Sequence, residues 1–398
     1  MMESIVPVPA GFSFAAHASG MRYQGRDDLA LIVSDRPAVG AGVFTKNLFQ
    51  AAPVTVAREN IKNSQSIRAF LVNAGQANAC TGDEGLANCR ATLEMMAERL
   101  GIEPGEILPA STGVIGPQLK MDLWRAEAPA LAAGLGKAAP LDAAKAIMTT
   151  DAFPKMAWGF VETPSGTVRL LGMAKGAGMI CPNMATMLGF VLCDADVEKA
   201  RWQAMLAAAV DASFNAVTVD GDTSTNDCVL AMANGASGVA VREDDELSAL
   251  AAALNELCQA LAYMIVEDAE GGTKIVRVHV TGAQDHMEAE ACARAVGHSP
   301  LVKTAMFGRD ANWGRIVAAV GRSGAEFDPA KVSVAIGGIP VFQNGQPVPG
   351  DLDSLLAPHM RRAEIAIDID LGAGEGEYLL LASDLGFDYV KCNASYRS

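Results

Sequence analysis

Thr186 is the residue of this sequence with the clearest potential for chemistry. It follows a stretch rich in Gly, Pro and Asn (175–183) and precedes the apolar run 187–193, which is typical of a buried strand. A threonine hydroxyl becomes a nucleophile when a base accepts its proton, and a free α-amino group, with a pKa of about 7.7–8.0, is one such base. Freeing that group requires cleavage of the chain between Ala185 and Thr186. The alternative is a structural threonine that simply favours a strand.

A second candidate element is the stretch 107–116, in which a short apolar strand runs into Thr112 and Gly113. Glycines at 113 and 116 allow backbone N–H groups to point at a ligand. Donors placed in advance where negative charge develops are what an oxyanion site needs. From the residues alone, a plain connection between a strand and a turn is the simpler interpretation.

Charged residues flank the stretch around Thr186 at a distance along the chain. Lys175 precedes a Gly-Ala-Gly turn and could hold a substrate carboxylate as a point charge, although a solvated surface lysine has the same pattern. Glu267, Asp268 and Glu270 gather at the expected C-terminal end of a helix, where negative charge opposes the helix dipole. This unfavourable placement indicates either a functional site or a solvated acidic end.

The segment 217–228 carries several acidic residues but lacks the spacing and the terminal Glu of an EF-hand. The eight cysteines contain no CxxC pair, and the five histidines show no ligand spacing. We therefore predict no metal site, and we interpret 217–228 as a hydrogen-bonded loop near the site.

These residues must be positioned by alternating strands and helices. The longest expected helix has apolar residues at steps of three and four, starts near Asp244 or Asp245 and ends at 271–272. A second helix runs from Thr81 or Asp83 to Gly101. Expected strands are 29–34, 41–45, 68–73, 273–281, 332–336 and 363–370.

The bulk properties limit the class of protein. A chain of 398 residues exceeds the usual single domain, so two domains, or one large domain with a satellite, are expected. The net charge of −15, without a basic run, argues against a nucleic-acid partner. The N-terminus lacks the pattern of a secretory signal, no apolar run reaches the length of a membrane helix, and the scattered cysteines read as reduced. We predict a cytoplasmic protein.

Several motifs resemble those of the ornithine acetyltransferase family, the bifunctional glutamate N-acetyltransferases of arginine biosynthesis. They are Asn-Met-Ala-Thr-Met-Leu (183–188), Ser-Thr-Gly-Val-Ile-Gly (111–116), Gly-Asp-Thr-Ser-Thr-Asn-Asp (221–227) and Glu-Gly-x-Thr-Lys (270–274). The resemblance runs through essentially the whole chain. It implies that Thr186 is the nucleophile, that Ala185–Thr186 is the bond cleaved, and that Thr112 and Gly113 form the oxyanion hole.

The resemblance also implies a set of substrate-binding residues. Ala152 stands where the family usually has a threonine, and Thr150 is an alternative to Thr149 that differs by one position. Asp310, Asn312 and Trp313 match another family stretch, which looks like a loop that shapes the pocket or an interface, without an assigned role. The implied binding residues are Thr149, Lys175, Thr186, Glu270, Asn393 and Ser398.

The implied fold is α/β, a layered sandwich of helices around mixed sheets that is not of the Rossmann type. Residues 1–185 and 186–280 would form the main catalytic domain, and residues 281–398 a smaller α+β region whose tail returns to the active site. The two self-cleaved chains would pair as an α2β2 heterotetramer.

The implied reaction moves acetyl from N2-acetylornithine to glutamate through an acetyl-threonine. It needs no bound cofactor, and acetyl-CoA can also donate in bifunctional members. Two alternatives remain. One is an N-terminal-nucleophile aminopeptidase or amidase, which would pass the acyl group to water, and the other is a catalytically silent scaffold.

Overall fold

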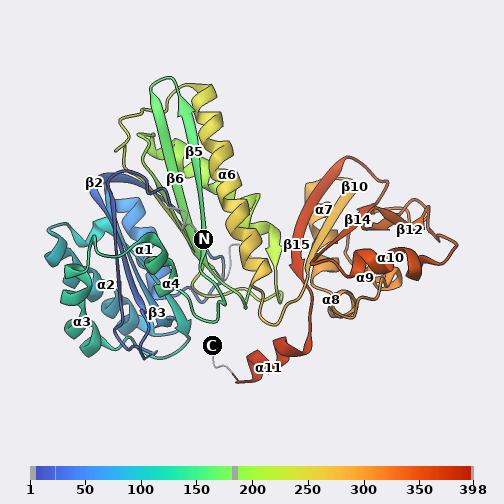
Figure 1. Ribbon diagram of the computed structural model, residues 1–398, viewed down its shortest axis with the longest axis horizontal. Coiled ribbons are helices and arrows are strands. Elements are labelled where there is room, and N and C mark those ends of the chain that lie inside the picture. Colours follow the sequence, from blue (N-terminus) through green and yellow to red (C-terminus); the bar gives the residue numbers. More distant parts are fainter. Residues whose placement is uncertain (1–5, 23, 182–186, 396–398) are drawn as a thin grey trace.

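The computed structural model describes residues 6–22, 24–181 and 187–395. It consists of a larger and a smaller unit, each built on a mixed sheet (Figure 1). The larger sheet has the strand order β4-β3-β2-β9-β7-β6-β5, with β1 also paired to β2. Its strands are β1 (Phe12–His17), β2 (Leu29–Phe44), β3 (Ile67–Gln76), β4 (Ile107–Val114), β5 (Lys155–Thr163), β6 (Gly166–Lys175), β7 (Leu188–Cys193) and β9 (Cys228–Ala233).

The long strand β2 joins the two halves of this sheet. Its first part pairs with β3 from Leu29 and its last part pairs with β9 up to Phe44, with a register shift between Val33 and Ala38. The halves pack face to face over a shared apolar core, in which the rings of Phe70 (β3) and Phe190 (β7) lie 5.5 Å apart. The larger unit is therefore a two-layered β structure connected by one continuous strand.

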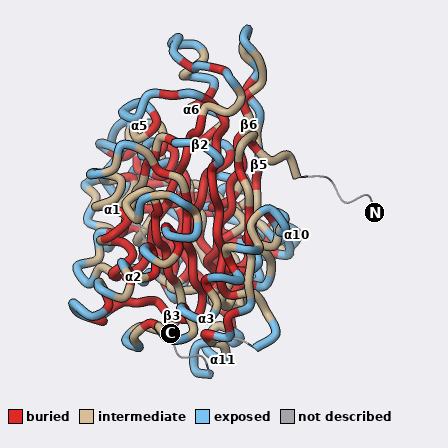
Figure 2. Tube along the Cα trace, turned by 90° about the vertical axis from the view of Figure 1, so that its left-hand side faces the viewer, coloured by how far each residue is buried: buried red, intermediate tan, exposed pale blue. Residues whose placement is uncertain are grey.

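Two groups of helices cover the outer faces of these layers, so the strands are buried between them (Figure 2). One group packs on β1, β2 and β4, and the other packs on β5, β6, β9 and the last part of β2. Helix α4 (Pro140–Ala146) packs on β1 and β2. This arrangement confirms the predicted α/β sandwich. The helices are α1 (Ala52–Asn63), α2 (Gly82–Leu100) and α3 (Met121–Ala133) on the first face, and α5 (Lys199–Asp211) and α6 (Asp244–Glu267) on the second.

Helix α6 has the predicted apolar stripe facing the sheet. A Cβ atom on Gly172 of β6 would lie 2.5 Å from a methyl group of Leu257 and 2.7 Å from one of Leu261, so the glycine allows the helix to approach closely. By length and composition alone α6 could cross a membrane, contrary to the expectation that no such run exists. Its packing is that of a core helix, because Leu250, Leu254, Leu257 and Leu261 are buried against the sheet.

The smaller unit is built on a second mixed sheet, with the order β13-β12-β11-β14-β10-β15-β8. Its strands are β8 (Val217–Thr218), β10 (Ile275–Ala283), β11 (Ser333–Ile336), β12 (Ile339–Gln343), β13 (Gln346–Pro347), β14 (Glu364–Asp370) and β15 (Gly376–Ser383). Its helices are α7 (His286–Gly297), α8 (Pro300–Phe307), α9 (Trp313–Gly321) and α10 (Leu352–Met360), and α11 (Phe387–Ser395) follows the sheet.

Two details differ from the sequence-based expectations. The strands expected at 29–34 and 41–45 are one strand, because the chain passes the Ser34–Pro37 corner without ending and the Ser34 hydroxyl donates to the carbonyl of Arg36 at 2.7 Å. In addition, β10 begins at Ile275 and already belongs to the second sheet, before the expected start of the C-terminal region at 281, and β8 joins that sheet from residues 217–218.

Phe190→Ala should destabilise the protein by about 3–5 kcal/mol, because it leaves a cavity between the two β layers. Chemical unfolding followed by circular dichroism measures this loss. Phe160→Ala is the matched control, since Phe160 on β5 is half-exposed and its loss should cost less than about 1 kcal/mol. Equal effects of the two substitutions would contradict the packing described here.

Candidate active site

Those predicted site residues that the structure describes lie close to the end of β6 and the turn that follows it. Lys175 ends β6 and pairs in register with Leu188, the first residue of β7, which pairs in turn with Cys228 of β9. Ala185, Thr186 and Ser398 lie outside the described residues. The chain resumes at Met187, whose carbonyl accepts a hydrogen bond from the N–H of Cys228 at 3.2 Å.

The ammonium group of Lys175 contacts two other predicted residues. Its Nζ donates to Thr149 Oγ1 at 2.8 Å and to Thr112 Oγ1 at 3.4 Å. Only 9% of the Lys175 side chain is exposed, so this is not the solvated surface lysine of the simpler interpretation. The arrangement places a positive charge directly beside the Thr112–Gly113 segment.

A row of buried charges continues behind Lys175. Asp151 lies 3.8 Å from Lys175 Nζ and accepts hydrogen bonds from Lys155 Nζ at 2.8 Å and from the N–H of Gly176 at 2.6 Å. Lys155 is fully buried and also donates to Asp268 at 2.6 Å. Opposite charges thus alternate from Asp268 through Lys155 and Asp151 to Lys175, which is how buried ions offset their loss of hydration.

The ionisation of Asp151 follows from these neighbours. Burial alone raises the pKa of its carboxyl group, but the charges of Lys175 and Lys155 and the hydrogen bonds from Lys155 and Gly176 outweigh it. The pKa therefore lies well below its usual value. Asp151 is anionic at neutral pH and presents a fixed negative charge to Lys175.

Gly113 is required by the close approach of two strands. It has a φ of +130°, and a Cβ atom there would lie 2.2 Å from the backbone carbonyl carbon of Gly75 in β3. No other residue type fits without moving the backbone. The glycine fixes the position of the Thr112–Gly113 segment relative to β3.

Glu270 and Asn393 form a second pair beside the turn that follows Lys175. The Glu270 carboxylate packs against Gly178, where a Cβ atom would lie 2.3 Å from Oε2, and the Glu270 N–H donates to the carbonyl of Ala177 at 2.8 Å. Asn393 of α11 donates to Glu270 Oε2 at 2.9 Å. The structure thus brings these two predicted residues together, although they are 123 positions apart.

The acidic residues at the end of α6 contact other residues of the site, as the first of the two sequence-based interpretations requires. The helix ends at Glu267 rather than at 271–272, and Glu270 lies beyond it. Asp268 is the partner of Lys155, and Glu270 is the partner of Asn393. The Asp268 and Glu270 side chains therefore bind partners outside the helix, and these contacts account for acidic residues at a helix end where the dipole disfavours them.

The loop 217–228 fixes the backbone on both sides of residues 182–186. Asp220 accepts hydrogen bonds from the N–H groups of Met179 at 2.6 Å and Ile180 at 2.8 Å, and Cys228 holds Met187. Asn226 donates to the carbonyl of Ser111 in β4 at 2.8 Å. The loop is therefore hydrogen-bonded architecture, and in the described part of the chain no group of three or more His, Cys, Asp or Glu could hold a metal.

Cys181 and His298 form a pair that could be mistaken for a nucleophile and its base. Their Sγ and Nε2 atoms are 3.3 Å apart. Burial, together with the charges of Arg294, Lys303 and Arg322, lowers the pKa of His298 to about 4, and burial raises the pKa of the Cys181 thiol. Both groups are neutral at pH 7, so Cys181 is not an activated thiolate.

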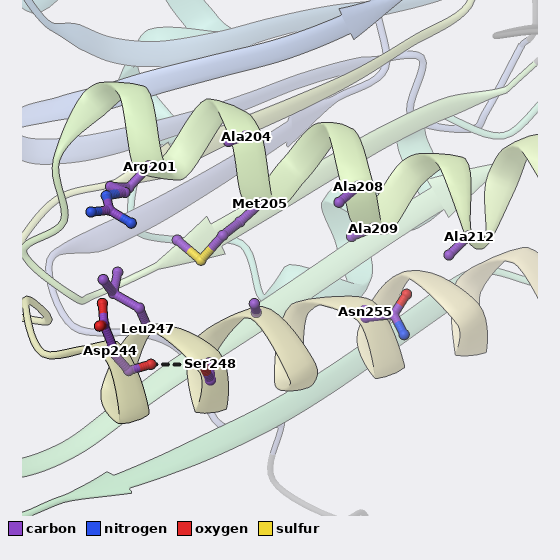
Figure 3. A pocket seen from close by; sticks show the side chains of 11 residues that line it. Arg201, Ala204, Met205, Ala208, Ala209, Ala212, Asp244, Leu247, Ser248 and Asn255 are labelled. Atoms are coloured by element: carbon purple, nitrogen blue, oxygen red, sulfur yellow. Dashed lines mark hydrogen bonds between the residues drawn. The ribbon is translucent and has the colours of Figure 1, made fainter.

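Two cavities of the described structure lie away from Lys175. One cavity, of about 670 Å³, lies beside α6 and β15 and is lined by residues including Tyr263, Arg277 and His279. Another, of about 610 Å³, lies between α5 and α6, where Met205 and Leu247 face each other near Arg201 and Asp244 (Figure 3). Neither contains a predicted site residue.

A model of the ArgJ family matches residues 13–398. The chain belongs to the ArgJ family. This membership confirms the family predicted from the sequence, and with it the prediction of an enzyme of arginine biosynthesis with glutamate N-acetyltransferase activity.

Relatives align with this chain over nearly its full length. The arginine biosynthesis bifunctional protein ArgJ of Nitratidesulfovibrio vulgaris is 61% identical, covering 98% of this chain and 99% of that protein. The protein of the same name from Geobacter sulfurreducens is 46% identical with the same coverage. The crystal structure of the arginine biosynthesis bifunctional protein argJ of Bacillus halodurans matches 53% of this chain and 100% of its own, with 38% identity and a TM-score of 0.51.

The structure adds to the site residues that had no individual role in the sequence analysis. Asp151, Lys155 and Asp220 touch predicted residues or the backbone that leads to them. For Asp151 and Lys155, the sequence shows only that the two opposite charges lie close together along the chain beside apolar residues. Conversely, Asn312 caps α9 through the N–H of Arg315 and contacts Asp310, and Trp313 stacks on Phe342 at 5.5 Å, so these residues organise the smaller unit.

Lys155→Met should destabilise the protein by about 3–5 kcal/mol, because it leaves Asp151 and Asp268 buried without their shared cation. Chemical unfolding at neutral pH measures the change. Lys145→Met, at an exposed position of α4, is the control and should alter stability by less than about 0.5 kcal/mol. A Lys155→Met protein as stable as the control would show that the buried row contributes nothing to the fold.

His298 should make stability depend on pH. Its folded pKa of about 4 lies below the unfolded value of 6.5, so between these values the unfolded chain binds a proton that the folded one does not. The free energy of unfolding should therefore fall as pH drops from 6.5 to 4, by up to about 1.4 kcal/mol per pH unit. His298→Gln should flatten this part of the profile. His286→Gln, at an exposed position, should leave it unchanged.

Proposed function

We propose that this protein is a self-cleaving N-acetyltransferase that moves acetyl from N2-acetylornithine to glutamate. The observation that carries the proposal is the buried ammonium group of Lys175, which donates hydrogen bonds to Thr112 and Thr149. Lys175 is the last residue of β6, and the chain continues from there to Thr186. A preplaced positive charge and hydroxyl groups in a water-poor setting favour a reaction that develops negative charge on an oxygen.

Self-cleavage is the first reaction. The Thr186 hydroxyl oxygen attacks the carbonyl carbon of Ala185, the peptide C–N bond breaks, and its nitrogen takes a proton to become a free α-amine. Water then hydrolyses the resulting ester, leaving a carboxylate on Ala185 and restoring the hydroxyl. The anchoring of Ile180 by Asp220 and of Met187 by Cys228 supports this step, because both sides of the bond are attached to one loop.

Acetyl transfer follows in two steps. The α-amine of Thr186 accepts the hydroxyl proton, the oxygen attacks the acetyl carbonyl of acetylornithine, and ornithine leaves with a proton on its amine. Glutamate then attacks the acetyl-threonine through its own amine and releases N-acetylglutamate. Thr112 and Gly113 stabilise the oxyanion in both steps. The acetyl group needs neither a metal nor a bound cofactor, and acetyl-CoA is a further donor for the first step.

The binding groups suit amino-acid substrates. Glu270 offers a carboxylate to a substrate ammonium, Lys175 offers an ammonium to negative oxygens, and Thr149 and Asn393 supply hydrogen bonds. Ser398 is proposed to complete the set. The two cleaved chains assemble as an α2β2 heterotetramer, and the free cysteines of the described chain are in keeping with a cytoplasmic enzyme.

Intact-mass measurement tests the proposal. Freshly purified protein should consist of chains 1–185 and 186–398, and acetylornithine should add one acetyl group to the second. Thr186→Ala should remain a single unacetylated chain, whereas Thr167→Ala, in the β5–β6 hairpin, should behave as wild type. A single wild-type chain inert to acetylornithine would rule out the mechanism. Acetate release that does not depend on glutamate would instead indicate an amidase.

A further inference from the structure

The C-terminal helix α11 is connected to the turn 176–181 through two carboxylates. Asn393 donates to Glu270, which packs on Gly178, and the Tyr389 hydroxyl donates to Asp220 at 3.3 Å, which holds Met179 and Ile180. In Figure 1, α11 lies beneath the space between the two units. Both contacts are made through a carboxylate that itself touches the turn leading to residues 182–186.

Asp220 stabilises an unfavourable backbone conformation. Met179 has a φ of +56°, which residues other than glycine rarely adopt. The two oxygens of Asp220 accept the successive N–H groups of Met179 and Ile180 at 2.6 and 2.8 Å. A carboxylate can accept both hydrogen bonds at once, whereas an asparagine would turn an NH2 donor towards one of them. The conformation of the turn therefore depends on this side chain.

Helix α11 is not held in place by a large apolar interface. None of its described residues is fully buried, and Phe387 and Val390 are 84% and 65% exposed. At its first residue the Phe387 ring contacts Phe307 of the smaller unit, and close to Tyr389 its backbone packs on Gly271, where a Cβ atom would lie 2.2 Å from the Tyr389 nitrogen. Within residues 6–22, 24–181 and 187–395, the side chains of α11 hydrogen-bond to Glu270 and Asp220 outside the helix.

We propose that Asp220 and Tyr389 are positioning residues for self-cleavage, and that the chain processes itself efficiently only when α11 has docked on the turn 176–181. Asp220 fixes the backbone that leads to the bond, and Tyr389 orients the Asp220 carboxylate. This inference rests on the self-cleavage described under the proposed function. It adds that the C-terminal end of the chain must fold before the chain is cut.

The rate of cleavage during cell-free synthesis of the full chain tests this inference. Asp220→Asn should slow the appearance of the two chains by roughly ten- to hundredfold, the effect of losing a charge-assisted hydrogen bond. Tyr389→Phe should slow it by about two- to fivefold, because it removes only one long neutral donor to the same carboxylate. Asp388→Asn, at the neighbouring exposed position of α11, should cleave at the wild-type rate.

A second control separates positioning from general stability. Ile367→Val, in the buried core of the smaller unit, lowers stability without touching the turn and should leave the cleavage rate unchanged. If Ile367→Val slows cleavage as much as Tyr389→Phe at a similar loss in melting temperature, Asp220 and Tyr389 act only through stability and the inference is wrong. Wild-type cleavage rates in both Asp220→Asn and Tyr389→Phe would also overturn it. Failure of the wild-type chain to cleave would overturn the proposed function instead.

Discussion

The fully buried ammonium group of Lys155 is the constraint on which the site depends. A lysine removed from water is tolerated only when anions surround it, and here Asp151 and Asp268 do so. Asp268 follows α6, and Asp151 lies in the segment between α4 and β5. Because both aspartates pair with Lys155, these parts of the chain meet at the first residue of β5. Lys175, at the end of β6, then faces an anion whose position and charge are fixed.

The loop 217–228 provides the complementary constraint at the other side of the site. It leaves the smaller sheet at β8 and enters the larger sheet at β9, so it belongs to both units. Along this path Asp220 accepts a hydrogen bond from the turn after Lys175. Asn226 donates a hydrogen bond to β4, and the N–H of Cys228 donates one to the carbonyl of Met187. One loop thus sets the distances between elements that are far apart in the sequence. The relative position of the two units and the geometry of the site are consequently linked.

Much of the fold and part of the site could be predicted from the sequence. The periodicity of α6 and the composition of β3 follow from local rules, and the motifs around 112 and 175 indicated a site. The corner of β2 was missed because Pro37 resembles a break, although a bulged strand tolerates it. The contact between Lys155 and Asp268 spans 113 positions, and no local pattern encodes it. Thr186 and Ser398 lie outside the described residues, so their roles remain predictions.

The strand order has a consequence for any chain cut between β6 and β7. β2 pairs with β9 and β6 pairs with β7, so the two adjacent strands that follow residues 182–186 lie between strands that precede them in the same sheet. Two severed pieces could not separate without losing both ladders and the core between them. Once separated, they would have to meet again by diffusion, because the covalent tether that keeps their effective concentration high would be gone. Refolding of such a protein depends on the concentration of its two pieces, so its working lifetime is set by the rate of unfolding.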